Sequence, residues 1–77
     1  MILTIDAGNS RVKYGLYEDD TLMKVIIRDS LVSQDIENIC IEYNIQRSIL
    51  CASRNLTPEN LAYLHARRTL IEDENTQ

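Results

Sequence analysis

Residues 1–17 read MILTIDAGNSRVKYGLY, and this stretch decides the fold. Residues 1–5 are almost entirely apolar, which is typical of a strand buried in the middle of a sheet with both faces covered. In residues 12–17 apolar positions alternate with Lys13, Gly15 and Tyr17, a pattern that predicts a second strand. The residues between the two segments include glycine, asparagine and serine, which are common in turns. We therefore expect an antiparallel hairpin whose turn contains the sequence DAGNS.

A third strand and a helix are expected after the hairpin. An acidic turn at residues 18–20 leads to residues 22–27, which are rich in β-branched side chains. Such short connections predict an antiparallel meander. Apolar residues then recur with helical spacing between positions 36 and 43, so we expect an amphipathic helix with Ser33 as its N-cap and Asn44 at its end.

The rest of the chain predicts a fourth strand, a second helix and the start of a fifth strand. Residues 48–52 read SILCA and form the fourth strand. Thr57 is the expected N-cap of a helix that has Pro58 at its first position and runs to about residue 67. Residues 69–71 could begin a fifth strand, although EDENTQ contains no apolar residue to extend it. The order β-β-β-α-β-α-(β) predicts a single α/β domain with a mixed sheet.

Size and composition limit the classes of protein. A chain of 77 residues forms at most one small domain, and its net charge of −4 argues against broad electrostatic binding of nucleic acid. Cys40 and Cys51 lack CxxC spacing, so we expect two reduced, buried thiols and no zinc site. His65, the only histidine, is expected at the surface, and the tyrosines are expected to pack their rings and expose their hydroxyls. Without a signal peptide or a membrane-spanning apolar run, we expect a cytoplasmic protein with no membrane partner.

The DAGNS turn is the candidate functional site. A tight turn aligns backbone N–H groups, and Gly8 would let a ligand approach them closely. Asn9 and Ser10 add side-chain donors, while Asp6 would face the same point from the end of a central strand. A carboxylate beside such donors suits a divalent cation that bridges the protein to a bound polyphosphate, to which Lys13 would add positive charge. The alternatives are a plain hairpin without a ligand and an exposed strand lysine.

The motif I-D-A-G-N-S-R-x-K-x-G-L-Y resembles the N-terminal phosphate motif of type III pantothenate kinases, in the acetate-and-sugar-kinase, hsp70 and actin superfamily. Ser10 stands where the family more often has threonine, and Asn9 separates this branch from relatives with D-x-G-G-T. The resemblance implies a ribonuclease H-like domain, ATP, Mg²⁺ and a monovalent cation (K⁺ or NH₄⁺) as cofactors, and pantothenate as substrate. It implies a metal site at Asp6 and a phosphate-binding hairpin at 6–13, formed by Asp6, Ala7, Gly8, Asn9, Ser10, Arg11, Val12 and Lys13.

The resemblance also implies that residues 1–77 are the truncated N-terminal part of such a kinase. The family's G-x-D-R motif, which holds the catalytic base, is not among these residues, so we expect this segment alone to be inactive. A non-catalytic nucleotide-binding or regulatory module of the same fold stays an alternative, as does a purely structural domain. We expect uncovered apolar surface and a free sheet edge to favour self-association, whereas the dimer contacts of the family lie largely outside this segment.

Overall fold

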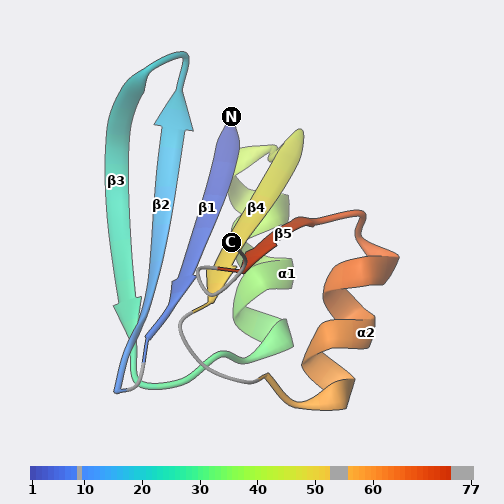
Figure 1. The fold of residues 1–77 in the computed structure, drawn as a ribbon. Helices are drawn as coiled ribbons and strands as arrows, with labels where there is room; N and C mark the ends of the chain where they lie inside the picture. Colours follow the sequence, from blue (N-terminus) through green and yellow to red (C-terminus); the bar gives the residue numbers. More distant parts are fainter. Residues whose placement is uncertain (9, 53–55, 74–77) are drawn as a thin grey trace.

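The computed structural model describes residues 1–8, 10–52 and 56–73, which form a small mixed α/β domain (Figure 1). Its five-stranded sheet has the strand order β3-β2-β1-β4-β5. The elements are β1 (Ile2–Ala7), β2 (Val12–Glu18), β3 (Thr21–Arg28), α1 (Ser33–Tyr43), β4 (Arg47–Ala52), α2 (Pro58–Ala66) and β5 (Leu70–Asp73). The expected order of strands and helices is confirmed.

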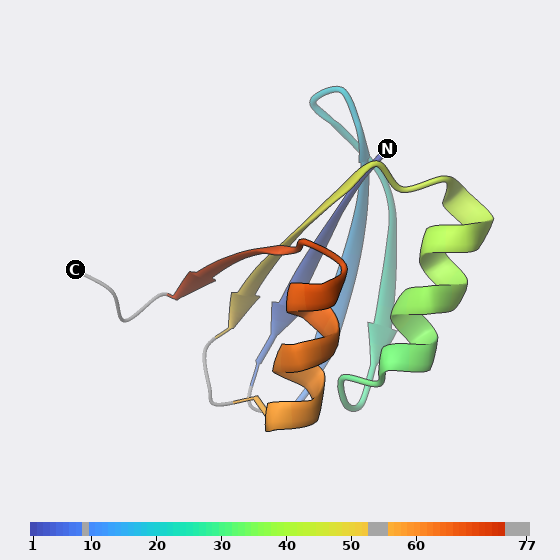
Figure 2. The same cartoon turned by 90° about the vertical axis from the view of Figure 1, so that its right-hand side faces the viewer.

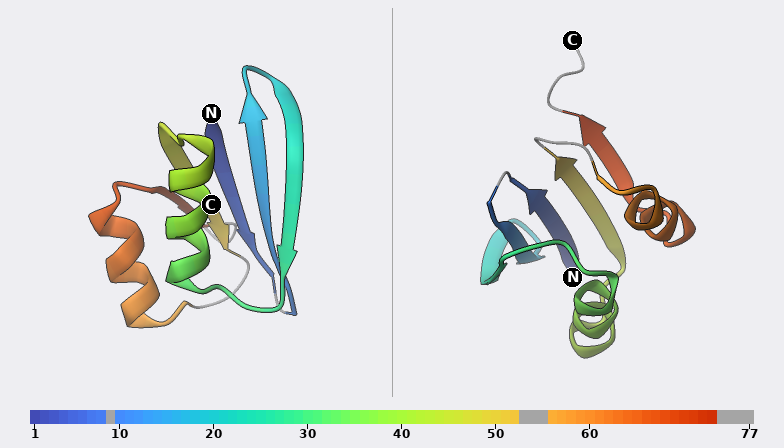
Figure 3. Two further views of the ribbon diagram at one scale, coloured as in Figure 1. Left: turned by 180° about the vertical axis from the view of Figure 1, so that it is seen from behind. Right: turned by 90° about the horizontal axis from the view of Figure 1, so that it is seen from below.

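The sheet combines an antiparallel half with a parallel half. β1, β2 and β3 form the expected antiparallel meander, and β4 and β5 continue from β1 in parallel. Parallel neighbours require long crossover connections, and α1 and α2 lie within them. Figures 2 and 3 show both helices against the same face of the sheet. We call the opposite face the open face.

The core lies between the sheet and the helices because strand side chains alternate between the two faces. The side chains that face the helices are buried on β1 (Leu3, Ile5, Ala7), on β2 (Val12, Tyr14, Leu16) and on β4 (Leu50). Ile2 and Thr4, on the open face of β1, are only half-buried. The expectation that residues 1–5 are covered on both faces is therefore wrong for the described part of the chain.

The end of α1 is as expected, whereas its start is not. Asn44 adopts the left-handed conformation with φ 53° and donates its N–H to the Cys40 carbonyl, an arrangement that often ends helices. The N-cap is Val32 rather than Ser33, and it makes no side-chain capping hydrogen bond. Ser33 is already helical because the extended backbone of Val32 supplies the carbonyl that accepts from Asp35 N–H at 3.0 Å.

The expected start of α2 is confirmed in detail. The Thr57 hydroxyl accepts a hydrogen bond from Asn60 N–H at 3.1 Å, and Pro58 is the first helical residue. Leu64 is the only buried residue that α2 contributes. Beyond the helix, Thr69 and Ser48 share a buried hydroxyl–hydroxyl hydrogen bond of 2.8 Å that joins the start of β5 to β4.

Two expectations about individual side chains need correction. Tyr14 is fully buried, so its hydroxyl is not exposed, and that hydroxyl has no hydrogen-bond partner within the described part of the chain. Burial and the nearby Asp35 carboxylate raise the pKa of Tyr14 to about 12. Neither cysteine forms a disulfide, as expected, but only Cys40 is buried and Cys51 is half-buried. His65 is exposed, as expected.

Within the described ranges, neither helix is long and apolar enough to cross a membrane.

Candidate functional site

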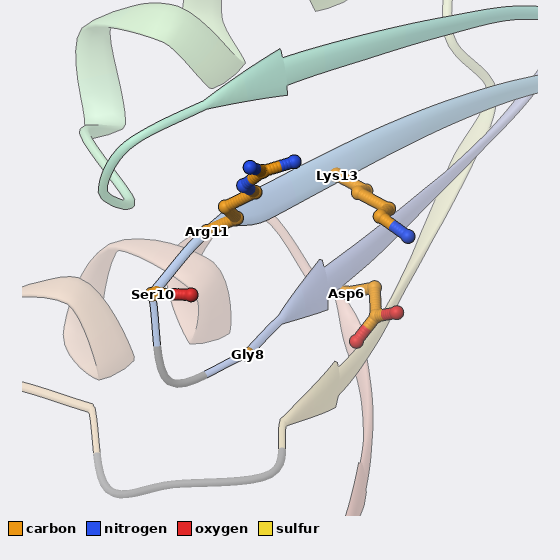
Figure 4. Close-up of a pocket in the computed structure, with 5 residues that line it drawn as sticks. All are labelled: Asp6, Gly8, Ser10, Arg11 and Lys13. Atoms are coloured by element: carbon orange, nitrogen blue, oxygen red, sulfur yellow. The ribbon is translucent and has the colours of Figure 1, made fainter.

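The hairpin between β1 and β2 forms an open pocket lined by Asp6, Gly8, Ser10, Arg11 and Lys13 (Figure 4). Asp6 and Lys13 are direct partners in the antiparallel register, so both side chains project from the open face. The pocket volume of about 170 Å³ is well below the roughly 300–1,000 Å³ of sites that enclose whole small molecules. The hollow therefore suits the phosphate end of a nucleotide rather than the entire molecule.

The backbone of the turn differs from the expectation at Gly8. Its N–H donates to the Arg11 carbonyl at 2.9 Å and closes the hairpin, so it is not available to a ligand. The N–H groups of Ser10 and Arg11 have no backbone acceptor among the residues that the structure describes. Of the N–H donors expected in the described part of the turn, those of Ser10 and Arg11 are therefore available to a ligand, and that of Gly8 is not.

Gly8 is not required by the fold. Its φ is not positive, so the backbone conformation is open to any residue. A β-carbon there would lie 3.4 Å from the Arg11 carbonyl, which is an ordinary contact. The glycine instead keeps the pocket wall free of a side chain, so a ligand can approach the backbone closely.

Within the described part of the chain, the charged side chains of the pocket are not engaged elsewhere. Asp6, Arg11 and Lys13 are exposed, and none forms an ion pair or a side-chain hydrogen bond with another described residue. The pocket thus carries one carboxylate and two cations that have no partner among the described residues, in a chain whose net charge is −4. This local excess of positive charge favours an anionic ligand.

The remaining residues of the predicted set contribute differently. The side chains of Ala7 and Val12 are buried in the core, so only their backbone could reach a ligand. They pair with each other at the base of the turn and hold the hairpin closed. Asn9, the residue that most specifically supports the family resemblance, lies outside the described residues.

A metal ion held by protein ligands alone does not fit the pocket. Asp6 is its only carboxylate, and no cluster of three or more His, Cys, Asp or Glu side chains exists in residues 1–8, 10–52 and 56–73. A magnesium ion that keeps several waters and binds substrate phosphates needs only one or two carboxylates. Asp6 fits that second arrangement.

Cys51 is a neighbour of the site that the sequence analysis placed in the core. Its register partner in the parallel pairing of β1 with β4 is Asp6, so its side chain also lies on the open face. The proximity of Cys51 to Asp6 follows from the parallel pairing of β4 with β1. Sequence periodicity identifies the two strands but does not show that they are neighbours. Because Cys51 is half-buried, thiol labelling offers a reporter beside Asp6.

No protein-family model matches the chain, and no curated protein matches it either.

Proposed function

We propose that the hairpin at residues 6–13 binds the phosphate groups of ATP, and that the chain is the N-terminal part of a phosphotransferase resembling type III pantothenate kinases. One observation carries the proposal. Asp6, Ser10, Arg11 and Lys13 meet at one pocket whose wall contains a glycine that the fold itself does not require.

The architecture supports the finer fold assignment. The strand order β3-β2-β1-β4-β5, with β2 antiparallel to the other four described strands and both helices on one face, agrees with the ribonuclease H-like arrangement of this kinase superfamily. The phosphate hairpin of such a domain follows its central first strand, as residues 6–13 do here.

Each residue of the pocket has a separate role in this proposal. Lys13 and Arg11 neutralise phosphate oxygens, and the Ser10 hydroxyl donates a hydrogen bond to them. The N–H groups of Ser10 and Arg11, which have no backbone acceptor among the described residues, serve as further donors. Gly8 gives the phosphates room, and Asp6 binds water molecules of a phosphate-bound Mg²⁺. Such a metal supplies charge stabilisation during phosphoryl transfer. The catalytic base and the pantothenate contacts would come from further chain, as would the monovalent-cation site.

Titration of the isotope-labelled 77-residue chain with ATP and Mg²⁺, followed by NMR, tests the binding step. The hairpin alone should bind with a dissociation constant of about 1 mM, and shifts should concentrate at Ser10, Arg11 and Lys13. Triphosphate should reproduce these shifts, whereas adenosine should not. Thiol labelling at Cys51 should slow as the site fills.

A matched pair of lysine variants separates specific binding from general attraction. Lys13→Gln should weaken ATP binding by at least about fivefold, which corresponds to roughly 1 kcal/mol for a charge-assisted contact. Lys24→Gln removes the same charge from β3, where Lys24 instead contacts the Tyr43 hydroxyl at 3.0 Å on the helix side of the sheet. Equal losses in the two variants, or shifts spread over the whole surface, would show that no phosphate site exists at the hairpin.

A further inference from the structure

The pocket spans two cross-strand pairs of the β1–β2 hairpin, and we call each pair a rung. Asp6 and Lys13 are register partners and form the inner rung. Gly8 N–H donates to the Arg11 carbonyl at 2.9 Å, so the antiparallel ladder continues to the outer rung, which Gly8 and Arg11 form. All four residues line the pocket. Alternate residues of a strand lie about 6.8 Å apart, so the rungs offer a ligand two separate positions.

The two rungs differ in charge. At the inner rung the Lys13 ammonium stands opposite a carboxylate, whereas at the outer rung Arg11 stands opposite a glycine, which has no side chain. Figure 4 shows the Lys13 side chain pointing toward Asp6 and the Arg11 side chain pointing away from Asp6. The two cations therefore do not converge on one point. The outer rung is a cation with open space beside it, and the inner rung is a cation beside an acid.

We propose that the pocket has two phosphoryl subsites, one at each rung, and that its ligands are chains of at least two phosphates, whatever group the chain carries. At the outer rung the Arg11 guanidinium binds phosphate oxygens, and the absence of a side chain at Gly8 leaves room for them. At the inner rung Lys13 binds the next phosphoryl group, and Asp6 is placed to accept from the water shell of a cation bound to it. The inference rests on the proposed phosphate binding and adds the number of phosphates that the site requires.

Two subsites make affinity depend on how many of them one ligand can fill. Inorganic phosphate fills either subsite but only one at a time, whereas pyrophosphate is the smallest ligand that reaches both. Once one end of a linked ligand is bound, binding of the other end is intramolecular and costs less entropy. Pyrophosphate should therefore bind at least about tenfold more tightly than phosphate.

NMR titration of the isotope-labelled 77-residue chain with phosphate and with pyrophosphate, both without metal, tests the two subsites. Pyrophosphate should shift the amides of both rungs. Arg11→Gln should weaken pyrophosphate binding at least about fivefold but phosphate binding at most about twofold, because phosphate still occupies the Lys13 subsite. Lys13→Gln should give the same split, with the remaining phosphate shifts at Arg11. Lys24→Gln, which removes a charge from β3 outside the pocket, should change neither affinity.

Failure of this inference is distinguishable from failure of the proposed function. If neither ligand shifts the hairpin amides, no phosphate site exists there and both proposals are wrong. If the two ligands bind with similar affinity, or if each pocket variant weakens both ligands by the same factor, the hairpin has a single anion subsite. Phosphate binding would then stand, and the two-subsite inference would be overturned.

Discussion

The two glycines of the chain have opposite relations to the fold. A β-carbon at Gly15 would lie 2.6 Å from Thr4 Oγ1 and 3.3 Å from the Tyr17 ring, so something must move to admit it. At Gly8 the nearest contact would be 3.4 Å. Packing on the open face therefore requires a glycine at position 15, whereas it does not require one at position 8.

Alanine at each position should separate these roles. Gly15→Ala should lower the free energy of unfolding by about 1–2 kcal/mol, because the crowding cost exceeds the usual gain from replacing a strand glycine. Gly8→Ala should change it by less than about 0.5 kcal/mol and instead weaken ATP binding severalfold. Urea denaturation and NMR titration measure the two quantities. A Gly8→Ala variant that is stable and binds ATP normally would argue against close approach of phosphate.

The buried Tyr14 hydroxyl gives a second prediction at this scale. Tyr14→Phe removes a polar group that has no hydrogen-bond partner among the described residues. Because such a group is costly to bury, the variant should be as stable as the natural chain or more stable by up to about 1 kcal/mol. Tyr17→Phe, on the half-buried side of β2, is the control. A loss of more than about 1 kcal/mol in Tyr14→Phe would mean that a water or another group satisfies the hydroxyl.

In the kinase that we propose, Asp6 is the residue on which phosphoryl transfer should depend. Asp6→Asn is nearly isosteric and removes the charge that holds the phosphate-bound metal, so turnover should fall about 10²- to 10⁴-fold while the fold is retained. Pantothenate phosphorylation at saturating ATP and Mg²⁺ is the measurement, with circular dichroism as the check on folding. Normal turnover would show that DAGNS is only a hairpin. The 77-residue chain itself should show no turnover.

The sequence predicted which side chains meet at the hairpin, but not the hydrogen bonds of its turn. Asp6 and Lys13 flank a short connection, so antiparallel pairing must bring them to one face. The Gly8 N–H closes the turn only in some turn conformations. Turn residues of this kind are compatible with several such conformations, so the sequence does not select one. The charge of the pocket was therefore predictable, and its set of free backbone donors was not.

At the scale of elements, local signals identified helices and strands and failed at boundaries set by tertiary contacts. The cap at Thr57 was readable because its hydroxyl, the following proline and the helix lie adjacent in sequence. β5 extends to Asp73 although residues 72–73 are acidic, because pairing with β4 continues to Ala52. Likewise the start of α1 is one residue earlier than a Ser33 cap implies, because the backbone of Val32 enters the helix without a side-chain cap.

A polar cluster joins the two helices. The Tyr63 hydroxyl donates to Glu37 Oε1 at 2.6 Å, and Arg67 donates to the same oxygen at 3.0 Å. The guanidinium also lies 5.8 Å from the centre of the Tyr63 ring. These contacts hold α2 against α1 beside the single buried residue that α2 provides.

Removal of the Tyr63 hydroxyl should loosen this contact. Tyr63→Phe should lower the free energy of unfolding by about 1 kcal/mol, as expected for a partly exposed hydrogen bond to a carboxylate. Burial and the bond to Glu37 raise the pKa of Tyr63 from 10.0 to about 12. Since the folded pKa lies above the unfolded one, this contribution is complete below pH 10 and is lost as the pH rises toward 12. The difference between the natural chain and Tyr63→Phe in urea denaturation should therefore shrink over that interval. Tyr43→Phe serves as the control, and a constant difference would contradict the assignment.

At the scale of the whole molecule, the two helices leave the sheet unequally supported. β1 lies at the centre between β2 and β4 and contributes three buried side chains, whereas β5 is a short edge strand that pairs, among the described strands, with β4 alone. No local pattern in the sequence predicts this strand order. The order depends on which strand lies next to the one that follows each crossover connection, and that is a tertiary contact. Regions with few buried apolar contacts open at lower free energy than the global transition. The unit formed by α2 and β5 should therefore open before the rest.

A matched pair of core substitutions tests this order of unfolding. Leu64 on α2 and Leu16 on β2 are both fully buried, so replacement by alanine removes the same atoms and should cost about 2–5 kcal/mol at either site. In Leu64→Ala this cost falls on the weakly held unit, so amides of α2 and β5 should lose hydrogen-exchange protection and NMR dispersion while those of β1, β2 and α1 keep theirs. In Leu16→Ala protection should fall throughout the chain, because the central strands unfold only with the whole domain. Uniform loss of protection in both variants would show that residues 1–73 unfold as one cooperative unit despite the uneven distribution of the core.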